Sequence, residues 1–282
     1  MIFMATMLFG GGFLFCKLYQ KSESTALPAT LLFALINSAV ISLEMLILNG
    51  IRIEFSLFSF VVALWYAANS LLYTYCSLKA LAYTNLSLYS MFAMLGGMLL
   101  PFVGGILFWK EALTFPKLLS CAITAVALKL CVQKNGADKK AILYYLLVFV
   151  FNGCNGIISK VHQSAENGQN ISEIGFLLLA NLSVFFVCIL SLLIFFRGKV
   201  RPVNLKSAVT YGIGYAVSNG SANLLLLIAL RYLDASVQYP LVTGGTIIVS
   251  AVISFFMKER MTKKHIVAVA LAFLSALIVI RS

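Results

Sequence analysis

The chain has 282 residues, of which 61% are hydrophobic and only 11% are charged, and its mean hydropathy is +0.99. A soluble domain has roughly a quarter of its residues charged, so this chain cannot cover a surface that faces water. A soluble enzyme, a secreted disulfide scaffold and a disordered protein are therefore disfavoured. The composition predicts a protein that crosses the membrane many times.

The net charge is +12, from 21 lysines and arginines against 9 acidic residues. The basic residues stand in short breaks between apolar runs, which is typical of topology signals and of contacts with anionic lipid headgroups. We therefore expect membrane lipids, and no nucleic acid, as partners. The six cysteines form no CxxC pair and lie in or beside apolar runs, so buried free thiols are expected and neither a metal nor another cofactor.

In chain order, charged or turn-rich breaks separate ten apolar runs, each long enough for a membrane-spanning helix of about 20 residues. The first begins at Met1, and we interpret it as a membrane helix and not as a removed signal peptide. The loops are too short to hold a soluble domain. The ten expected helices lie near residues 1–20, 27–49, 56–79, 84–109, 115–133, 141–163, 172–196, 205–230, 235–257 and 263–281.

The two halves of the chain repeat each other. The residues Phe108, Lys110, Glu111 and Thr114 recur 148 positions later as Phe256, Lys258, Glu259 and Thr262. The pair Gly96 and Gly97 recurs at the same offset as Gly244 and Gly245. The stretch Gly10–Lys17 likewise matches Gly153–Lys160. We predict a first five-helix repeat over 1–134, a loop over 135–140 and a second five-helix repeat over 141–282.

Because each copy has an odd number of spans, the second copy is inverted in the membrane. Inverted repeats of this kind meet near the bilayer midplane, and rocking one against the other gives alternating access. The predicted fold class is an all-α membrane protein with ten transmembrane helices arranged as two inverted five-helix repeats.

The repeated motifs resemble those of the drug/metabolite transporter superfamily, in its EamA-like ten-helix branch. An Ala-Leu-x-Tyr sequence begins at Ala80 and again at Ala229, and each is followed by a Lys-Glu-x-x-Thr sequence, ending at Thr114 and Thr262. The resemblance implies a central cavity lined by the first four helices of each half. It also implies that the fifth helix of each half packs peripherally or at a homodimer contact.

One feature departs from that superfamily. The four-helix multidrug relatives carry a proton-coupling glutamate about two turns before the lysine of the first helix, whereas this chain has Phe9 and Asn152 at the two corresponding positions. That proton-exchange mechanism is therefore not expected here.

Polar stripes on three expected helices are the candidate substrate site. Amides and phenols within the membrane bind partners on other helices or line a polar cavity, and both roles are open here. The spacing of three and four residues places the members of each stripe on one helix face. The candidate residues are Tyr66, Asn69 and Tyr73 in the third helix, Asn152 and Asn155 in the sixth, and Tyr215, Asn219 and Asn223 in the eighth.

Three charged residues are candidates for coupling or charge compensation. Glu44 stands inside an apolar run, where it could bind a cationic substrate, carry a coupling proton or pair with a lysine. Lys17 and Lys160 could neutralise an anionic group, but we expect their side chains to snorkel to the interface. The paired glycines Gly96, Gly97, Gly244 and Gly245 predict close helix packing or gating.

The sequence has no nucleophile elbow, phosphate-binding loop or metal-ligand cluster, so no enzymatic activity is expected. The predicted function is a secondary transporter or exporter of small polar or amphipathic metabolites, amino acid-like or amine-like, in the plasma membrane. A lipid flippase on the same fold is the alternative, and a channel is a weaker one.

Two arguments disagree on orientation. The odd-numbered loops with their adjoining helix ends carry 15 of the 21 basic residues, and the positive-inside rule then places both termini outside. The family resemblance implies both termini in the cytosol, and we follow it because an inverted repeat weakens the charge bias.

Overall fold

A computed structural model describes residues 1–23, 25–110, 114–132, 139–165, 170–195, 204–229, 232, 235–259 and 262–279. Over these residues it consists of helices without strands. Six of the helices, namely α1 to α4, α6 and α7, are each long and apolar enough to cross a bilayer. The ten bounds are α1 Ile2–Ser22, α2 Leu27–Leu48, α3 Leu57–Tyr83, α4 Leu86–Trp109, α5 Phe115–Val132, α6 Lys139–Gln163, α7 Glu173–Phe195, α8 Leu205–Ala229, α9 Ala235–Phe256 and α10 Lys263–Val279.

The predicted all-α membrane fold is confirmed, and the ten expected runs match the ten helices closely. The largest change is at the end of the third helix, which runs to Tyr83 and not to residue 79. In addition, α6 begins at Lys139, inside the expected loop 135–140. Residues 133–138 lie outside the described part of the chain.

Local side chains begin the third and fourth helices. The hydroxyl of Ser56 accepts a hydrogen bond from the Ser59 N–H at 3.1 Å, and the Asn85 amide oxygen accepts one from the Leu88 N–H at 2.8 Å. Each cap satisfies a backbone donor that the first turn leaves unpaired. The sequence Asn-Leu-Ser-Leu thus begins a new helix directly after α3.

The helix ends preserve a trace of the duplication. Lys110 ends α4 and Lys258 follows α9, and both have a φ of 55°. This left-handed conformation is uncommon in residues other than glycine. Its recurrence at the two lysines of the repeated motif means that both copies leave their fourth helix by the same backbone turn.

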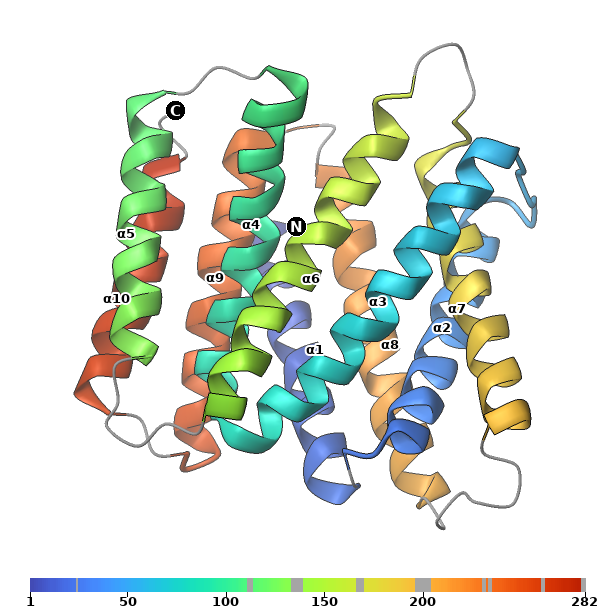
Figure 1. Ribbon diagram of the computed structural model, residues 1–282, viewed down its shortest axis with the longest axis horizontal. Helices are drawn as coiled ribbons and strands as arrows, with labels where there is room; N and C mark the ends of the chain where they lie inside the picture. The colour runs from blue at the N-terminus through green and yellow to red at the C-terminus, as the bar shows by residue number, and fades with distance from the viewer. Residues whose placement is uncertain are drawn as a thin grey trace.

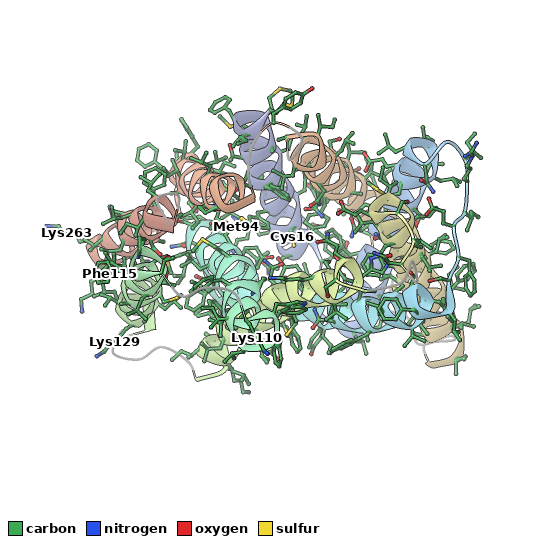
Figure 2. The ribbon with its side chains drawn as sticks, turned by 90° about the horizontal axis from the view of Figure 1, so that it is seen from above. Cys16, Met94, Lys110, Phe115, Lys129 and Lys263 are labelled. Atoms are coloured by element: carbon green, nitrogen blue, oxygen red, sulfur yellow. The ribbon has the colours of Figure 1, made fainter. Side chains whose placement is uncertain are left out.

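Eight helices form a ring in which the two halves alternate. Each helix packs mainly against two neighbours, in the order α1, α8, α2, α7, α3, α6, α4, α9 and back to α1. Helices α1 and α8 face α3 and α6 across the middle of the bundle in the view from above (Figure 2). Exchanging each helix with the one five places later maps this order onto itself.

The exchange also reverses helix direction. In Figure 1, α1 ends at the lower edge of the bundle, where α6 begins. The two halves are therefore related as an inverted pair, which accords with the predicted fold class.

Helices α5 and α10 stand outside the ring as a pair. They pack on each other, and α10 also packs on α9, so Phe115 and Lys263 lie at one narrow end of the molecule (Figure 2). Buried hydroxyls join the pair: Ser275 Oγ lies 2.8 Å from Ser120 Oγ and 2.6 Å from Thr124 Oγ1. The peripheral placement that the resemblance implies for these helices is what the structure has.

Candidate functional site

Two of the polar stripes face the interior of the ring. On α8, the exposed residues Ile213 and Val217 point outward, so Tyr215 and Asn219, on the opposite side of the helix, point inward. On α3, the exposed Leu64, Ala68 and Leu72 leave Tyr66 and Tyr73 on the inner side. The structure therefore brings equivalent helices of the two halves together with their polar faces turned inward.

The stripe on α3 is bound to neighbouring helices. The Asn69 amide donates hydrogen bonds to the Phe151 carbonyl and to Asn155 Oδ1, both at 2.8 Å. The hydroxyl of Tyr73 lies 3.1 Å from the hydroxyl of Tyr89 on α4. These bonds hold α3 to α6 and α4, so this side of the site is positioned in advance.

The stripe on α8 has no such ties among the described residues. The Asn223 amide donates to the Asn219 carbonyl, at 2.8 Å in its own helix, and no interhelical bond is formed by Tyr215 or Asn219. The Tyr215 ring lies 5.3 Å from that of Phe33. Of the predicted stripe residues, only Asn69 and Tyr73 are buried. The polar groups of Tyr215 and Asn219 are therefore not engaged by neighbouring helices in the described part of the chain.

On α6, the predicted residues divide between two roles. The Asn152 amide donates to the Ala93 carbonyl of α4 at 2.7 Å, which makes it a link between these two helices. Asn155 is the partner of Asn69 and so lies beside the α3 stripe. Of these two, only Asn155 belongs to the group that we call the inward polar cluster, which consists of Asn69, Tyr73, Asn155, Tyr215 and Asn219.

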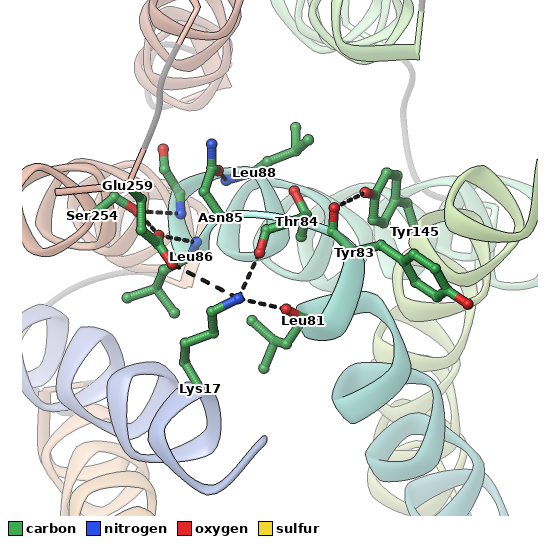
Figure 3. A network of polar contacts seen from close by, with 11 residues as sticks. Lys17, Leu81, Tyr83, Thr84, Asn85, Leu86, Leu88, Tyr145, Ser254 and Glu259 are labelled. Atoms are coloured by element: carbon green, nitrogen blue, oxygen red, sulfur yellow. Dashed lines mark hydrogen bonds and ion pairs between the residues drawn. The ribbon is translucent and has the colours of Figure 1, made fainter. Parts of the chain in front are cut away.

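Lys17 points into the protein and binds other helices, in contrast to the snorkelling expectation. Its side chain is buried, and its ammonium group donates to the carbonyls of Leu81 and Thr84, the latter at 2.7 Å (Figure 3). The Lys17 Nζ also lies 3.7 Å from Glu259 Oε1. One carboxylate and two carbonyls within the protein therefore compensate the positive charge of Lys17.

The carboxylate of Glu259 completes this cluster from the second half. Its Oε2 accepts hydrogen bonds from the Leu86 N–H at 2.7 Å and from the Ser254 hydroxyl at 2.9 Å. The Ser254 Oγ accepts from the Ser87 N–H at 2.9 Å. Because a helix N-terminus favours negative charge and acceptors, the end of α9 caps the start of α4. We call Lys17, Glu259 and Ser254, with the carbonyls and N–H groups they bind, the closed-end cluster.

From the sequence, Glu259 is part of a repeated motif at a helix end, where a loop ion pair or a cap is expected, but its actual partners, Lys17 and the start of α4, are not indicated. The signal that could have located the cluster is the recurrence of a lysine in the first helix and a glutamate after the fourth helix of each copy. No spacing within one segment reveals it, because four separate helices contribute.

The opposite end of the ring differs. The repeat partner of Lys17 is Lys160, which is only partly buried and whose Nζ lies 4.9 Å from the centre of the Trp109 ring. The partner of Glu259 would be Glu111, which lies outside the described residues. In the described part of the chain, α1 contacts α3 and α4, whereas α6 makes no comparable contact with α8 or α9.

The paired glycines are sites of close helix contact. An added Cβ at Gly96 would come within 2.7 Å of the Phe149 Cα on α6, and one at Gly97 would come within 2.7 Å of Asn152 Nδ2. In the second half, a Cβ at Gly244 would lie 2.8 Å from Phe273 Cδ2, and one at Gly245 would lie 2.6 Å from Thr6 Cγ2. The packing role is thus supported, and a role in gating stays a prediction.

Glu44 lies apart from the inward cluster. It contacts Gly220 and Ser221 of α8, on the side of α2 where Ile47 and Leu48 are exposed. Neither Lys17 nor Lys160 pairs with it. The structure therefore separates Glu44 from the residues with which the sequence analysis had grouped it.

Comparisons with known proteins agree with this architecture. Residues 139–281 match the model of the EamA-like transporter family. One solved structure, titled only "Crystal structure of protein", is similar over 98% of this chain and 96% of its own, with a TM-score of 0.61 and 14% identity. At that identity the likeness concerns the fold alone. No curated protein matches the chain.

The family model covers half of the chain, and ten helices with inward polar faces accompany it. Membership implies a small-molecule substrate and a membrane environment. The chain belongs to the EamA-like transporter family of the drug/metabolite transporter superfamily and is an integral, multi-pass membrane transporter of small solutes.

Proposed function

We propose that the protein is a secondary transporter that exports small polar or amphipathic metabolites, amino acid-like or amine-like, by alternating access in the plasma membrane. The observation that carries the proposal is the inward polar cluster. Asn69 and Tyr73 are held in place on α3, across the ring from Tyr215 and Asn219 on α8, whose side chains make no interhelical hydrogen bond among the described residues.

Amides and phenols suit such solutes. An amide can donate to a carboxylate and accept from an ammonium group, and phenol rings can contact both cations and apolar stems. The inward cluster has no carboxylate among the described residues, which disfavours polycations as substrates. Zwitterions and aromatic solutes fit the available donors, acceptors and rings.

A difference in helix packing between the two ends supports alternating access. The closed-end cluster joins α1, α3, α4 and α9 at one end, and α1 contacts α3 and α4, whereas the described part of α6 makes no comparable contact with α8 or α9. In an inverted-repeat transporter, the second conformation exchanges the roles of the two halves. The closed-end cluster would then separate as α6 approaches α8 and α9. The repeat boundaries 1–134 and 141–282, and a homodimer contact through α5 and α10, stay predictions.

The test is counterflow of radiolabelled amino acids and amines in proteoliposomes. We expect saturable exchange of at least one of these solutes, lost on Asn219→Leu because the partner-free amide is removed. Asn181→Leu is the matched control, since the Asn181 amide donates to its own helix at the Leu177 carbonyl and lies outside the stripes. Exchange that survives Asn219→Leu, or no flux of any solute with folded protein, would contradict the proposal.

The same vesicles separate the alternatives. Unsaturable flux would indicate a channel, and movement of a fluorescent lipid between leaflets without solute exchange would indicate a flippase.

A further inference from the structure

Glu44 occupies a groove on the outer face of the bundle, between α2 and α8. The exposed residues Leu43, Ile47 and Leu48 mark the outward side of α2 here. On α8, the exposed Val217 lies one turn away from Gly220 and Ser221. The groove therefore opens toward the lipid, on the opposite side of α8 from the inward polar cluster.

The carboxylate of Glu44 is incompletely satisfied. Ser221 lines the same hollow, and Glu44 Oε2 is buried without a hydrogen-bond partner among the described residues. Gly220 makes the approach possible, because a Cβ there would overlap Oε2. The absence of a side chain at residue 220 thus brings a carboxylate oxygen against the backbone of α8.

In the described part of the chain, no cation pairs with this carboxylate. The one ion pair found there joins Lys17 to Glu259. No charged group of the described residues contributes to the electrostatic environment of Glu44. An uncompensated carboxylate on an apolar helix face is unfavourable, so a cation from outside would be bound favourably here.

A small hollow lies directly beside the carboxylate. Its volume is about 190 Å³, and it is lined by Glu44, Ile47, Leu48, Gly220, Ser221 and Leu224. Pockets for drug-sized ligands are larger, roughly 300–1,000 Å³. This hollow has room for one polar group and a short apolar stem, and its lining offers both polar and apolar contacts.

We propose that this hollow binds the primary ammonium group of an amphiphilic amine that enters sideways from the bilayer. Glu44 and the Ser221 hydroxyl accept hydrogen bonds from the ammonium group, while Ile47, Leu48 and Leu224 contact the attached carbons. The site is separate from the inward polar cluster and does not depend on the proposed transport function. The amine can be a free amphiphile or the headgroup of an aminolipid, which share this chemistry.

The test is chemical labelling of Glu44 in phosphatidylcholine nanodiscs. A hydrophobic carbodiimide reacts with carboxyl groups that face the apolar phase, and mass spectrometry of the digested protein locates the adduct. We expect Glu44 to be labelled, and octylammonium to lower its total modification, counted as the carbodiimide N-acylurea plus the octylamide that forms when the amine displaces the urea. Octanol, which has the same chain without the charge, should not lower it. Glu44→Gln is the control that loses the adduct.

Two further labelling experiments identify the source of the amine and test the role of Ser221. Nanodiscs of phosphatidylethanolamine protect Glu44 without added amine if an aminolipid is the source, and leave it labelled if only free amines bind. Ser221→Ala removes one acceptor, so octylammonium should protect about fivefold more weakly, while labelling without amine stays.

Three outcomes would overturn the proposal. Labelling that neither amine source prevents would show a carboxyl that carries only a proton. Equal protection by octanol would show apolar filling of the hollow. No labelling of folded protein would show that the bilayer has no access to Glu44. None of these readouts depends on solute flux, so they leave the transport proposal unaffected.

Discussion

The ammonium group of Lys17 lies 3.7 Å from the carboxylate of Glu259, although one belongs to the first helix and the other follows the ninth. The exposed fractions of the two side chains are only 7% and 11%. Lys17 also binds the carbonyls of Leu81, in the last turn of α3, and of Thr84, which follows α3, and Glu259 caps α4. A single ion pair therefore holds one end of the ring together.

Replacing Glu259 with Gln should loosen that end. The change leaves Lys17 buried without its counter-ion, which costs about 3 kcal/mol when one partner of a buried pair is removed. Cys16, next to Lys17, is only 2% exposed and reports on the opening. We expect a lower Tm and faster reaction of Cys16 with N-ethylmaleimide, located by mass spectrometry. Glu173→Gln, at an exposed position where α7 begins, is the control; an unchanged Cys16 rate in Glu259→Gln would contradict the closed-end cluster.

Replacing Asn69 and replacing Asn219 should have different effects on the thermal stability of the protein. Asn69→Leu removes two interhelical hydrogen bonds and leaves Asn155 Oδ1 without its partner, for a loss of about 1–2 kcal/mol. Asn219→Leu removes no interhelical bond among the described residues, so its Tm should stay within about 1 °C of the wild type, since surface-like changes cost little. The measurement is the Tm of both variants in detergent. An equal decrease of Tm in the two variants would show that Asn219 also bonds α8 to a neighbouring helix.

Gly96→Ala should be clearly destabilising. Its Cβ would overlap the Phe149 backbone, which cannot give way as a flexible side chain could, and overpacking costs about 1–3 kcal/mol. Gly11→Ala is the matched control on α1, because the nearest atom to its Cβ would be Ser218 Oγ at 3.9 Å. Helix propensity favours alanine at both positions. A Gly96→Ala variant as stable as Gly11→Ala would exclude tight α4–α6 packing.

Glu54 should make stability depend on pH. Its carboxylate accepts hydrogen bonds from the hydroxyl and the N–H of Ser172, both at 2.7 Å, and these hold its pKa below the ordinary value. The stabilisation is therefore present above the ordinary glutamate pKa and is lost as the pH falls through the lowered one. Because Glu54 is partly exposed, the effect is about 1 kcal/mol or less. Between about pH 6 and pH 3, the wild type should lose more Tm than Glu54→Gln; identical losses would show that the Ser172 bonds do not form.

A reporter at the C-terminus addresses orientation. We expect green fluorescent protein fused there to fluoresce, as it does in the cytosol, because the family resemblance outweighs the charge bias. The closed-end cluster, on the edge away from both termini in Figure 1, then faces outward and the cytosolic side is the less closed one. A dark fusion with an intact protein would favour the positive-inside count instead.

The helices could be located from the sequence because each is a local object. A run of about 20 apolar residues between charged breaks determines a spanning helix with little help from elsewhere. The inward direction of Tyr215 and Asn219 could also be predicted, since helical spacing alone places them on one face. Both inferences depend only on residues within about 25 positions of each other.

The closed-end cluster could not be found in that way. Lys17 stands near a helix end, where snorkelling is the usual outcome for a lone lysine, and its partners come from α3, α4 and α9. Likewise, no residue near Glu44 in the sequence indicates that it contacts Gly220 and Ser221. The packing of helices that are distant in the sequence determines which polar groups come into contact, and neither composition nor local spacing predicts that packing.

The alternating order of the ring bears on how the protein is made. Helices α1 to α4 leave the ribosome long before α8, α7, α6 and α9, which fill the gaps between them. During synthesis, the faces of the early helices that pack against these later ones therefore stay exposed in the bilayer. Lys17 likewise has no counter-ion until Glu259 has been synthesised. Neither half expressed by itself should form a stable bundle, whereas co-expressed halves should assemble by interleaving.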